Sequence, residues 1–367
     1  MSKTVYLHIG MPKTATTALQ TFLPLNQKIL NRHGFVYPEM PFEFEGVAPG
    51  RNGYFLSFWL HRKDHPEWKK GLELVEKSIK KYENVILSDE GLWSRQRMRK
   101  FWKRIRRKVY RMDADIKVIV YLRRQDDEIE SIWNQRVKSH KVHIQESFEE
   151  YMQNGDYAYM PLDYDQALDR IVKWIGKENL IVRPFEKQQF AGGTIYADFL
   201  HAVGLEFTDE YELPPYTANV RLPDNAVEIK RQVNGLFKKN DTFDFYNEAM
   251  IDAFGTGLMK ERPRQKTSMF SPEQRAEFME RYEKGNAYVA REYLGRDDGI
   301  LFYEDSGTLP QWKPDSHEMI EDAVRVLGGA DVYLYEKQEE MKRKLQEIND
   351  ALPFVAYRKL AGKGKGE

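Results

Sequence analysis

Short, continuous runs of apolar residues, many of them β-branched, recur along the first half of the chain. They cover residues 4–9, 84–88, 116–122 and 180–182, and helix-like sequence separates each run from the next. Runs of this length and composition are typical of parallel strands that are buried on both faces. Their alternation with helices predicts an α/β fold built on an open parallel sheet flanked by helices.

The segments between these runs carry apolar residues at intervals of three and four, which is the spacing of one buried helix face. The clearest stripe consists of Met98, Trp102, Ile105, Val109 and Met112. A proline inside such a segment bends or interrupts the helix. The predicted helices cover residues 14–31 (bent or interrupted near Pro24), 94–112, 125–139 and 164–176.

The second half of the chain, after residue 206, is predicted to be largely helical. Its end, residues 315–352, has helical spacing, and we expect an interruption at Gly328 and Gly329 because glycine is a poor helix former. The predicted division is an α/β domain over residues 1–310 (core 1–205, helical acceptor-side region 206–310) and a helical C-terminal extension over residues 311–367.

Composition narrows the class of protein. The 367 residues contain 57 Lys and Arg and 57 Asp and Glu, so net charge gives no support for nucleic-acid binding. There is no cysteine, which excludes disulfides and thiolate metal sites. No apolar run reaches the roughly 18 residues of a membrane helix, and no signal peptide is visible. We therefore expect a cytoplasmic protein without a transmembrane segment.

The segment from Ile9 to Leu19 follows the first predicted strand and opens a helix. This P-loop-like turn presents unpaired backbone N–H groups at the positive end of a helix dipole. Lys13 adds a movable positive charge, and three threonines add hydroxyl donors. The segment therefore predicts an anion site at the carboxyl end of a parallel strand, with a capped helix and a chance lysine as the alternative.

The same residues resemble the 5′-phosphosulfate loop of sulfotransferases that use 3′-phosphoadenosine 5′-phosphosulfate (PAPS). The pattern Pro-Lys-Ser/Thr-Gly-Thr-Thr reads here Pro12-Lys13-Thr14-Ala15-Thr16-Thr17. The resemblance implies that Lys13, Thr14, Ala15, Thr16 and Thr17 bind the cofactor. Ala15 departs from the usual glycine, and an alanine fits if the turn needs no positive φ at that position.

The third strand ends at Arg123 and Arg124, and Ser131 lies eight positions after Arg123. In this family an arginine at that strand end and a serine eight positions later hold the 3′-phosphate, so the resemblance assigns Arg123 and Ser131 to it. Arg124 is the alternate arginine, and a surface arginine with an ordinary helix serine is the plain alternative.

Other segments extend the resemblance to bacterial members of the family. Residues 182–186 and 293–298 are similar to theirs, and the resemblance spans roughly residues 3–305. The Arg-Lys-Gly loop that completes the 3′-phosphate site in cytosolic animal members is not apparent. The basic run at residues 262–266 is one substitute for it.

Sulfuryl transfer resembles phosphoryl transfer and needs a cation at the leaving oxygen and a base for the acceptor proton. Lys13 suits the first role. In family members the base is a histidine or glutamate, and Glu90 is the first candidate here and Asp89 the second. His61 and His8 stay open, and first-turn helix acids are the plain alternative for the two carboxylates. No metal is required.

Two segments point to the acceptor. Ten of the seventeen residues from Arg95 to Arg111 are Lys or Arg, which suits either a solvated face or a docking surface for an anionic acceptor or the inner face of the membrane. Aromatic residues between Arg51 and Trp59 fit either the core or a sugar site. We expect a glycan or glycolipid acceptor.

The resemblance therefore implies a PAPS-dependent sulfotransferase that acts on a hydroxyl or amine and releases 3′-phosphoadenosine 5′-phosphate (PAP). A non-catalytic regulator or scaffold that binds adenosine nucleotides is the alternative. A nucleotide kinase is a weaker one, because the sequence offers no clear Mg²⁺ ligands.

Overall fold

The computed structural model describes most of the chain. The described residues are 3–48, 50–58, 66–95, 97–139, 142, 144–155, 157, 160–215, 224–236, 249, 253, 267–304 and 309–361, the last of these without side chains beyond residue 350.

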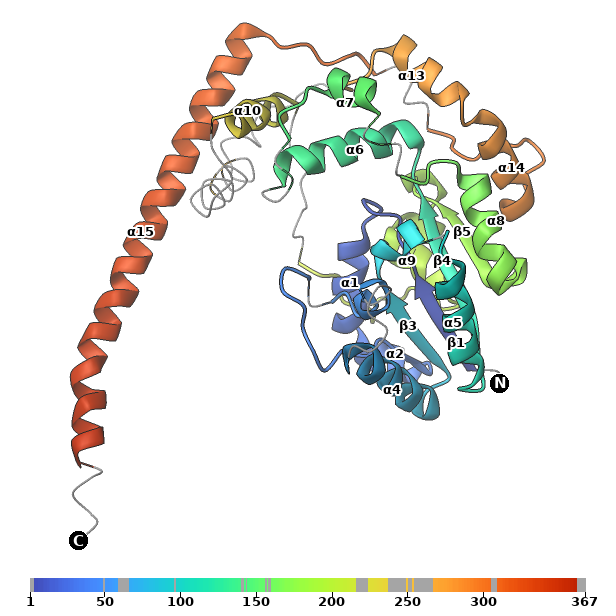
Figure 1. The fold of residues 1–367 in the computed structure, drawn as a ribbon, viewed down its shortest axis with the longest axis horizontal. Coiled ribbons are helices and arrows are strands. Elements are labelled where there is room, and N and C mark those ends of the chain that lie inside the picture. Colours follow the sequence, from blue (N-terminus) through green and yellow to red (C-terminus); the bar gives the residue numbers. More distant parts are fainter. Residues whose placement is uncertain are drawn as a thin grey trace. The chain divides into compact units, whose positions relative to one another are not determined.

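Five parallel strands form one open sheet in the order β2-β3-β1-β4-β5 (Figure 1). β1 is central, with Leu7 facing Leu87 of β3 and Val118 of β4. The strands are β1 Lys3–His8, β2 Phe35–Val36, β3 Asn84–Ser88, β4 Ala114–Leu122 and β5 Leu180–Pro184. The prediction of an open parallel sheet is confirmed. β2 was not predicted, because two residues give no periodic signal.

Helices connect the strands. They are α1 Thr16–Leu25, α2 Gln27–Arg32, α3 Tyr54–Phe58, α4 Pro66–Lys81, α5 Arg99–Tyr110, α6 Gln125–Lys138, α7 Phe148–Asn154, α8 Tyr164–Ile175, α9 Ile195–Ala202, α10 Asp224–Asn234, α13 Pro272–Glu280, α14 Glu283–Leu294 and α15 Ser316–Ala361. Short 3₁₀ turns are η2 Glu90–Arg95, η3 Lys177–Asn179, η4 Lys187–Gln189 and η5 Ala191–Gly193.

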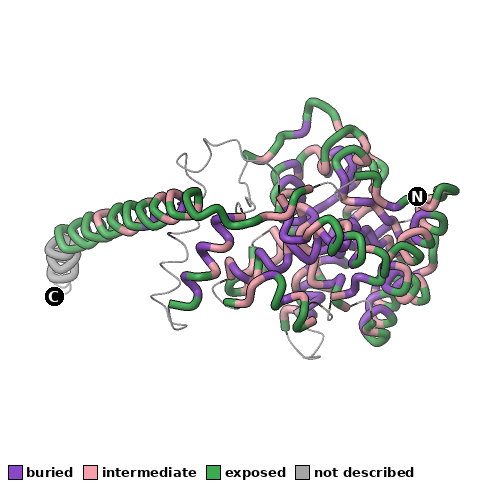
Figure 2. Tube along the Cα trace, turned by 90° about the horizontal axis from the view of Figure 1, so that it is seen from above, coloured by how far each residue is buried: buried purple, intermediate pink, exposed green. Residues whose placement is uncertain are grey.

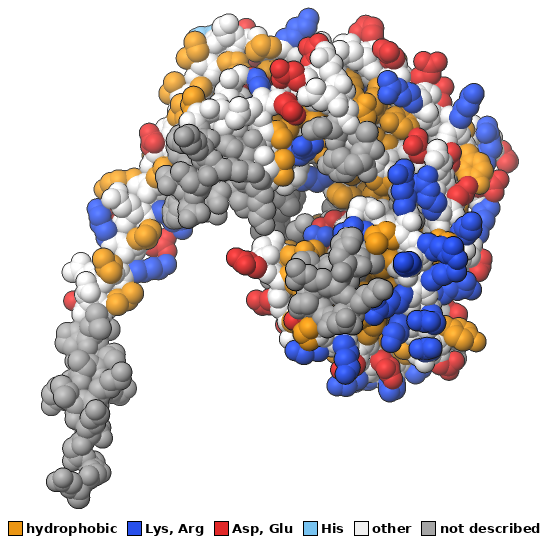
Figure 3. Space-filling model, viewed as in Figure 1, with side chains coloured by type: hydrophobic (Ala, Val, Ile, Leu, Met, Phe, Trp, Pro, Cys, Tyr) orange, Lys and Arg blue, Asp and Glu red, His pale blue; other side chains and the backbone are white. Residues whose placement is uncertain are grey.

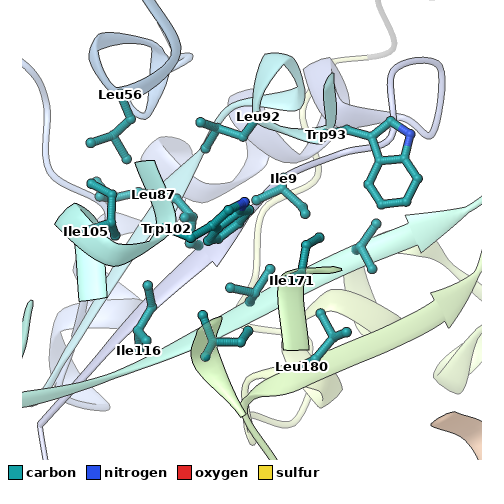
Figure 4. Close-up of a cluster of buried hydrophobic side chains, with 14 of the residues drawn as sticks. Ile9, Leu56, Leu87, Leu92, Trp93, Trp102, Ile105, Ile116, Ile171 and Leu180 are labelled. Atoms are coloured by element: carbon teal, nitrogen blue, oxygen red, sulfur yellow. The ribbon is translucent and has the colours of Figure 1, made fainter. Parts of the chain in front are cut away.

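Each face of the sheet has its own hydrophobic core. On one face, strand residues such as Leu7 and Val118 pack with α4, α5, α8 and α14, and Figure 4 shows part of this cluster around Trp102. On the other face, Tyr6, Ile86 and Ile119 pack with α1, α2 and α9. Two buried faces explain why the strands read as continuous apolar runs.

Two predicted helices differ in detail from the structure. The first is divided at Asn26, two residues after Pro24, into α1 and α2, as the proline indicated. The helix predicted over residues 94–112 instead begins at Arg99, and the 3₁₀ turn η2 precedes it. The carbonyl of Arg95, the last residue of η2, accepts hydrogen bonds from the backbone N–H of Met98 and the indole of Trp102.

The chain divides into two compact units. The first comprises residues 1–132, 154–219 and 272–308, and it contains the sheet. The second comprises residues 133–153, 220–271 and 309–367. The division at residue 310 made from the sequence stays a prediction.

Within the second unit, α10 packs against the first part of α15. The buried amide of Asn225 donates to Asp322 at 2.8 Å and accepts from the indole of Trp312 at 2.7 Å. α15 is continuous, so the predicted interruption at Gly328 and Gly329 is wrong. A Cβ on Gly329 would lie 2.8 Å from the Cβ of Ala253, so the glycine permits a close approach rather than ending the helix.

Most residues of α15 between positions 331 and 350 are exposed (Figure 2). Among the described residues, no helix is long and apolar enough to cross a membrane.

Candidate anion-binding site

Three neighbouring strands end at the same edge of the sheet, and the residues singled out from the sequence follow them. The loop with Lys13 follows β1, Asp89 and Glu90 follow β3, and Arg123 follows β4. Because the strands are parallel and β1 lies between the other two, the fold brings these segments together at the carboxyl edge, where open α/β sheets bind ligands.

The loop after β1 is held close to β4 and then turns sharply. The N–H groups of Ile9 and Met11 donate to the carbonyls of Ile119 and Tyr121, both at 3.0 Å. The hydroxyl of Thr14 donates to the carbonyl of Met11 at 2.7 Å, which closes the turn. This hydroxyl therefore shapes the loop.

Positive φ angles occur at both Lys13 (64°) and Ala15 (56°). Among the described residues other than glycine, only Asp113 shares this conformation. Alanine was expected to fit at position 15 if the turn needs no positive φ there. The structure shows that the turn does need positive φ at Ala15. An L-residue in this region is strained by roughly 1–2 kcal/mol, and strain of this kind concentrates at functional sites.

Lys13 and Arg123 lie side by side. The Arg123 guanidinium donates to the carbonyl of Lys13 at 3.4 Å, and both side chains are half-buried. Burial lowers the pKa of Lys13, and the neighbouring Arg123 lowers it further, while the carboxylates of Glu128 and Glu90 act in the opposite direction. The site therefore concentrates two cations with the first-turn N–H groups of α1, an arrangement that suits an anion.

The other predicted phosphate ligands have distinct positions. Ser131 is half-buried on α6, Thr16 is buried at the start of α1, and Thr17 is exposed. Arg124 donates to the carbonyl of Glu304 at 2.9 Å and lies 3.2 Å from a carboxylate oxygen of Asp126. Its guanidinium thus ties a later segment of the chain, which leaves Arg123 as the arginine beside the Lys13 loop.

Glu128 also belongs to this site, although the sequence analysis did not predict it. It lies in the first turn of α6, its side chain is fully buried, and neither carboxylate oxygen accepts a hydrogen bond from the described residues. Burial raises the pKa of Glu128 to about 7, although the positive charges of Arg123 and Lys13 act against this. Glu128 precedes Ser131 by one helical turn, and this spacing was the available signal.

The two candidate bases, Asp89 and Glu90, are joined by Arg51. Its guanidinium bonds Asp89 and lies 3.0 Å from a carboxylate oxygen of Glu90. Asp89 is fully buried, whereas the Glu90 side chain is 21% exposed. Glu90 also packs against the loop: a Cβ added at Gly10 would lie only 2.9 Å from the Cβ of Glu90. Glu90 is therefore the more accessible of the two.

A buried chain of hydrogen bonds leads from Glu90 into the sheet. The Gln20 amide donates to Glu90 at 3.0 Å and to the Ser88 hydroxyl at 3.2 Å, and that hydroxyl lies 2.9 Å from Nδ1 of His8. Burial lowers the pKa of His8 to about 3, so its ring is neutral at physiological pH. The other histidine kept open, His61, lies outside the described residues, as does the basic run 262–266.

Lys and Arg side chains gather over α5 (Figure 3). Several of them contact aromatic rings of the neighbouring helices: Arg104 lies 4.6 Å from the ring centroid of Trp68, and Lys103 lies 5.1 Å from that of Trp174. Arg106 also donates to the carbonyl of Trp174 at 3.0 Å. Part of this basic face thus stabilises the packing of α5 against α4 and α8.

The aromatic segment that begins at Arg51 contributes mainly to the core, which is one of the two roles expected for it. Phe55 and Leu56 are buried. A cavity of about 90 Å³ lies beside them, lined in part by Phe42, Phe44 and Arg51. Trp59 lies outside the described residues.

The two further segments that resembled the family both contact the chain that follows α14. The carboxylate of Glu186 accepts the backbone N–H groups of Tyr303 and Glu304 at 2.9 and 3.0 Å. Arg296 donates to the carbonyls of Ile300 and Leu301. Both segments therefore hold the chain that follows α14. No cluster of potential metal ligands occurs in the part of the chain that the structure describes.

Comparisons with known proteins name no function for the chain. No family model matches it. An uncharacterized protein of Archaeoglobus fulgidus is 26% identical over 220 residues. The match covers 57% of this chain and 54% of the relative, so the chain spans about half of its relative's length. A crystal structure of a sulfotransferase from Alicyclobacillus acidocaldarius is similar with a TM-score of 0.36 and 14% identity, over 66% of this chain and 99% of that one.

Proposed function

We propose that the protein is a sulfotransferase that uses PAPS and transfers its sulfuryl group to a hydroxyl or amine. The observation that carries this proposal is the convergence of the Lys13 loop with Arg123 from the neighbouring strand β4, where the two residues are joined by a 3.4 Å contact. One adenosine nucleotide with phosphates at both the 5′ and 3′ positions needs two adjacent groups of cationic and N–H donors.

The residues present fit such a ligand. A phosphomonoester binds best to a forked guanidinium and to backbone N–H groups at a helix start, and Arg123 and the beginning of α1 supply these. Ser131 adds a hydroxyl on α6. Glu128 opposes an anion, because its carboxylate is buried beside the same two cations.

The bound donor supplies an activated sulfuryl group on a phosphate leaving group. Lys13 and the loop N–H groups stabilise negative charge at the leaving oxygen. Glu90 receives the proton of the acceptor, while Arg51 and Gln20 hold its carboxylate in place. Asp89, buried behind Arg51, orients that arginine.

For the acceptor we propose a glycan or glycolipid. Glu90 is only partly exposed. Arg51, which lies 3.0 Å from a carboxylate oxygen of Glu90, lines a small cavity together with the aromatic residues Phe42 and Phe44. The exposed basic residues of α5 support electrostatic docking of an anionic acceptor or membrane surface.

The first experiment compares ligands on the full chain. Isothermal titration calorimetry should show that PAP binds with a micromolar or lower dissociation constant and adenosine 5′-phosphate much more weakly. Arg123→Ala should weaken PAP binding by about 10- to 100-fold, the value of a charged hydrogen bond, and leave adenosine 5′-phosphate little changed. Arg124→Ala is the matched control and should keep the ratio of the two affinities. Equal affinity for both ligands in the unaltered chain would refute the 3′-phosphate role of Arg123.

The second experiment needs no knowledge of the acceptor. Conversion of PAPS to PAP with water as acceptor is followed chromatographically, and Lys13→Ala should slow it by at least about 100-fold. Lys28→Ala, on α2, is the control. A Lys13→Ala protein that is folded and fully active would refute the mechanism.

A non-catalytic nucleotide-binding protein is the second candidate, and one observation favours it. Both candidate bases are engaged by Arg51, and Asp89 is fully buried. Tight binding of PAP together with no Lys13-dependent turnover of PAPS would favour this alternative.

A further inference from the structure

Glu128 is unusual because it is a fully buried carboxylate and neither oxygen accepts a hydrogen bond from the residues described. Buried polar atoms without partners are rare, and a buried charge without partners is costly. A glutamine or leucine would fill this position at lower cost. The carboxylate therefore calls for an explanation in terms of what the site binds.

The charged and titratable groups that act on Glu128 come from four parts of the fold. Lys13 acts from the loop after β1, Arg123 from the end of β4, Asp127 from α6 itself and the hydroxyl of Tyr164 from α8. Glu90, from η2, acts on the same Lys13. Tyr164 also donates to the carbonyl of Arg123 at 2.6 Å. Two cations thus compensate Glu128 partly, at the place where the proposed ligand would bring its own negative charge.

We propose that Glu128 is the internal counter-ion of Lys13 and Arg123 and that it takes up a proton from solvent when nucleotide phosphates bind to these two residues. The inference rests on the proposed function, since it takes PAP as the ligand. A phosphate bound to Lys13 and Arg123 neutralises these two cations, so their positive charge no longer stabilises the ionised carboxylate of Glu128. The Glu128 carboxylate then becomes a neutral carboxyl group, and no other bond is made or broken.

The pH dependence of binding follows from this exchange. Burial already places the pKa of Glu128 at about 7, so near pH 6 the group is largely protonated and costs the ligand nothing. At pH 8 most molecules must bind a proton together with the ligand, which weakens affinity by about tenfold. The phosphates themselves lose their second proton near pH 6, so at pH 8 they contribute no proton of their own.

Glu128→Gln keeps the shape of the side chain and imitates its protonated form. It should bind PAP about tenfold more tightly than the unaltered chain at pH 8 and with similar affinity at pH 6. Glu149→Gln, an exposed glutamate on α7, is the matched control and should leave both affinities unchanged.

The experiment is isothermal titration calorimetry of the full chain with PAP at pH 8, in two buffers of different ionisation enthalpy. The dependence of the measured heat on the buffer gives the number of protons taken up. We expect close to one proton per PAP for the unaltered chain and for Glu149→Gln, and close to none for Glu128→Gln. Circular dichroism of each variant establishes that it is folded.

The outcomes separate the two ideas. Binding of PAP without proton uptake, or with the same uptake in Glu128→Gln, overturns the role of Glu128 and leaves the proposed function standing. The absence of PAP binding in all three proteins between pH 6 and pH 8 overturns the proposed function and, with it, the role of Glu128 in ligand binding.

Discussion

Two sides of helix α6 carry buried carboxylates in opposite situations. Asp126 and Glu130, four positions apart and so on one face, are paired with the buried guanidinium of Arg275 from α13. Glu128, on the other side, lies near two cations, but neither of its oxygens accepts a hydrogen bond from the described residues. Within five positions of one helix, carboxylates are thus hydrogen-bonded to a buried guanidinium on one side and left without a hydrogen bond from the described residues on the other.

The difference distinguishes buried carboxylates that hold helices together from one that can respond to a bound ligand. A buried ion pair with good geometry contributes little net stability, but loss of one partner is costly because the other charge stays buried. A partly compensated carboxylate instead responds to small changes in its surroundings, including a new anion. The pairing with Arg275 explains how α13 is attached to α6 within the first unit, whereas Glu128 is coupled to the Lys13 loop.

The largest expected effect is on the compensated side. Arg275→Met removes the guanidinium that the two buried carboxylates share and should lower the free energy of unfolding by about 3–5 kcal/mol. Urea denaturation measures this loss as a shift of the midpoint concentration, provided that the slope of the unfolding free energy against urea concentration stays the same. Arg281→Met, at an exposed position just after α13, is the control. A loss below about 1 kcal/mol would mean that the two sides of α6 do not differ as described.

Glu128→Gln should have the opposite sign and depend on pH. The pKa of Glu128 in the folded protein is about 7, above the ordinary value of 4.5. The folded protein therefore loses stability as pH rises from 4.5 to 7, because the buried carboxyl group must ionise. Relative to the unaltered chain, Glu128→Gln should gain little at pH 4.5 and about 2–3 kcal/mol at pH 7 and above. Ligand-free melting curves from pH 4.5 to pH 8 measure the gap, and parallel profiles would contradict it.

A smaller effect tests whether Lys13 is the cation that Glu128 needs. Lys13→Met should cost about 1 kcal/mol at pH 8, where Glu128 is ionised, and almost nothing at pH 5. In the Glu128→Gln background this cost should vanish at both pH values. A double-mutant cycle of unfolding free energies at the two pH values measures the coupling, and an equal cost in both backgrounds would show that the residues act independently.

The smallest effect concerns the strained loop that carries Lys13. Ala15→Gly removes the positive-φ strain but increases the freedom of the unfolded chain, so the expected net gain is about 0.5 kcal/mol. Ala18→Gly, inside α1, should instead lose about 1 kcal/mol because it only weakens a helix. Thermal unfolding of the two variants compares them, and a loss of similar size in both would place Ala15 in unstrained backbone.

Local sequence patterns determined much of the fold. Apolar β-branched runs marked β1, β3, β4 and β5, and helical spacing marked α6 and α8 within a residue or two of their ends. The strand-to-helix turn at Lys13 and the arginine at the end of β4 were visible for the same reason. Each of these features is specified by neighbours close in sequence, through backbone preference and the period of side-chain burial.

Tertiary structure alone decided the rest. The sequence Asp126-Asp127-Glu128 reads as an ordinary acidic first turn of a helix, yet Asp126 and Glu128 are buried on opposite sides while Asp127 stays half-exposed. Gly329 reads as a helix break, yet contact with Ala253 makes it part of a continuous helix. In each case the outcome depends on residues far away in the sequence, because burial and charge compensation are set by what packs against a side chain and not by its chain neighbours.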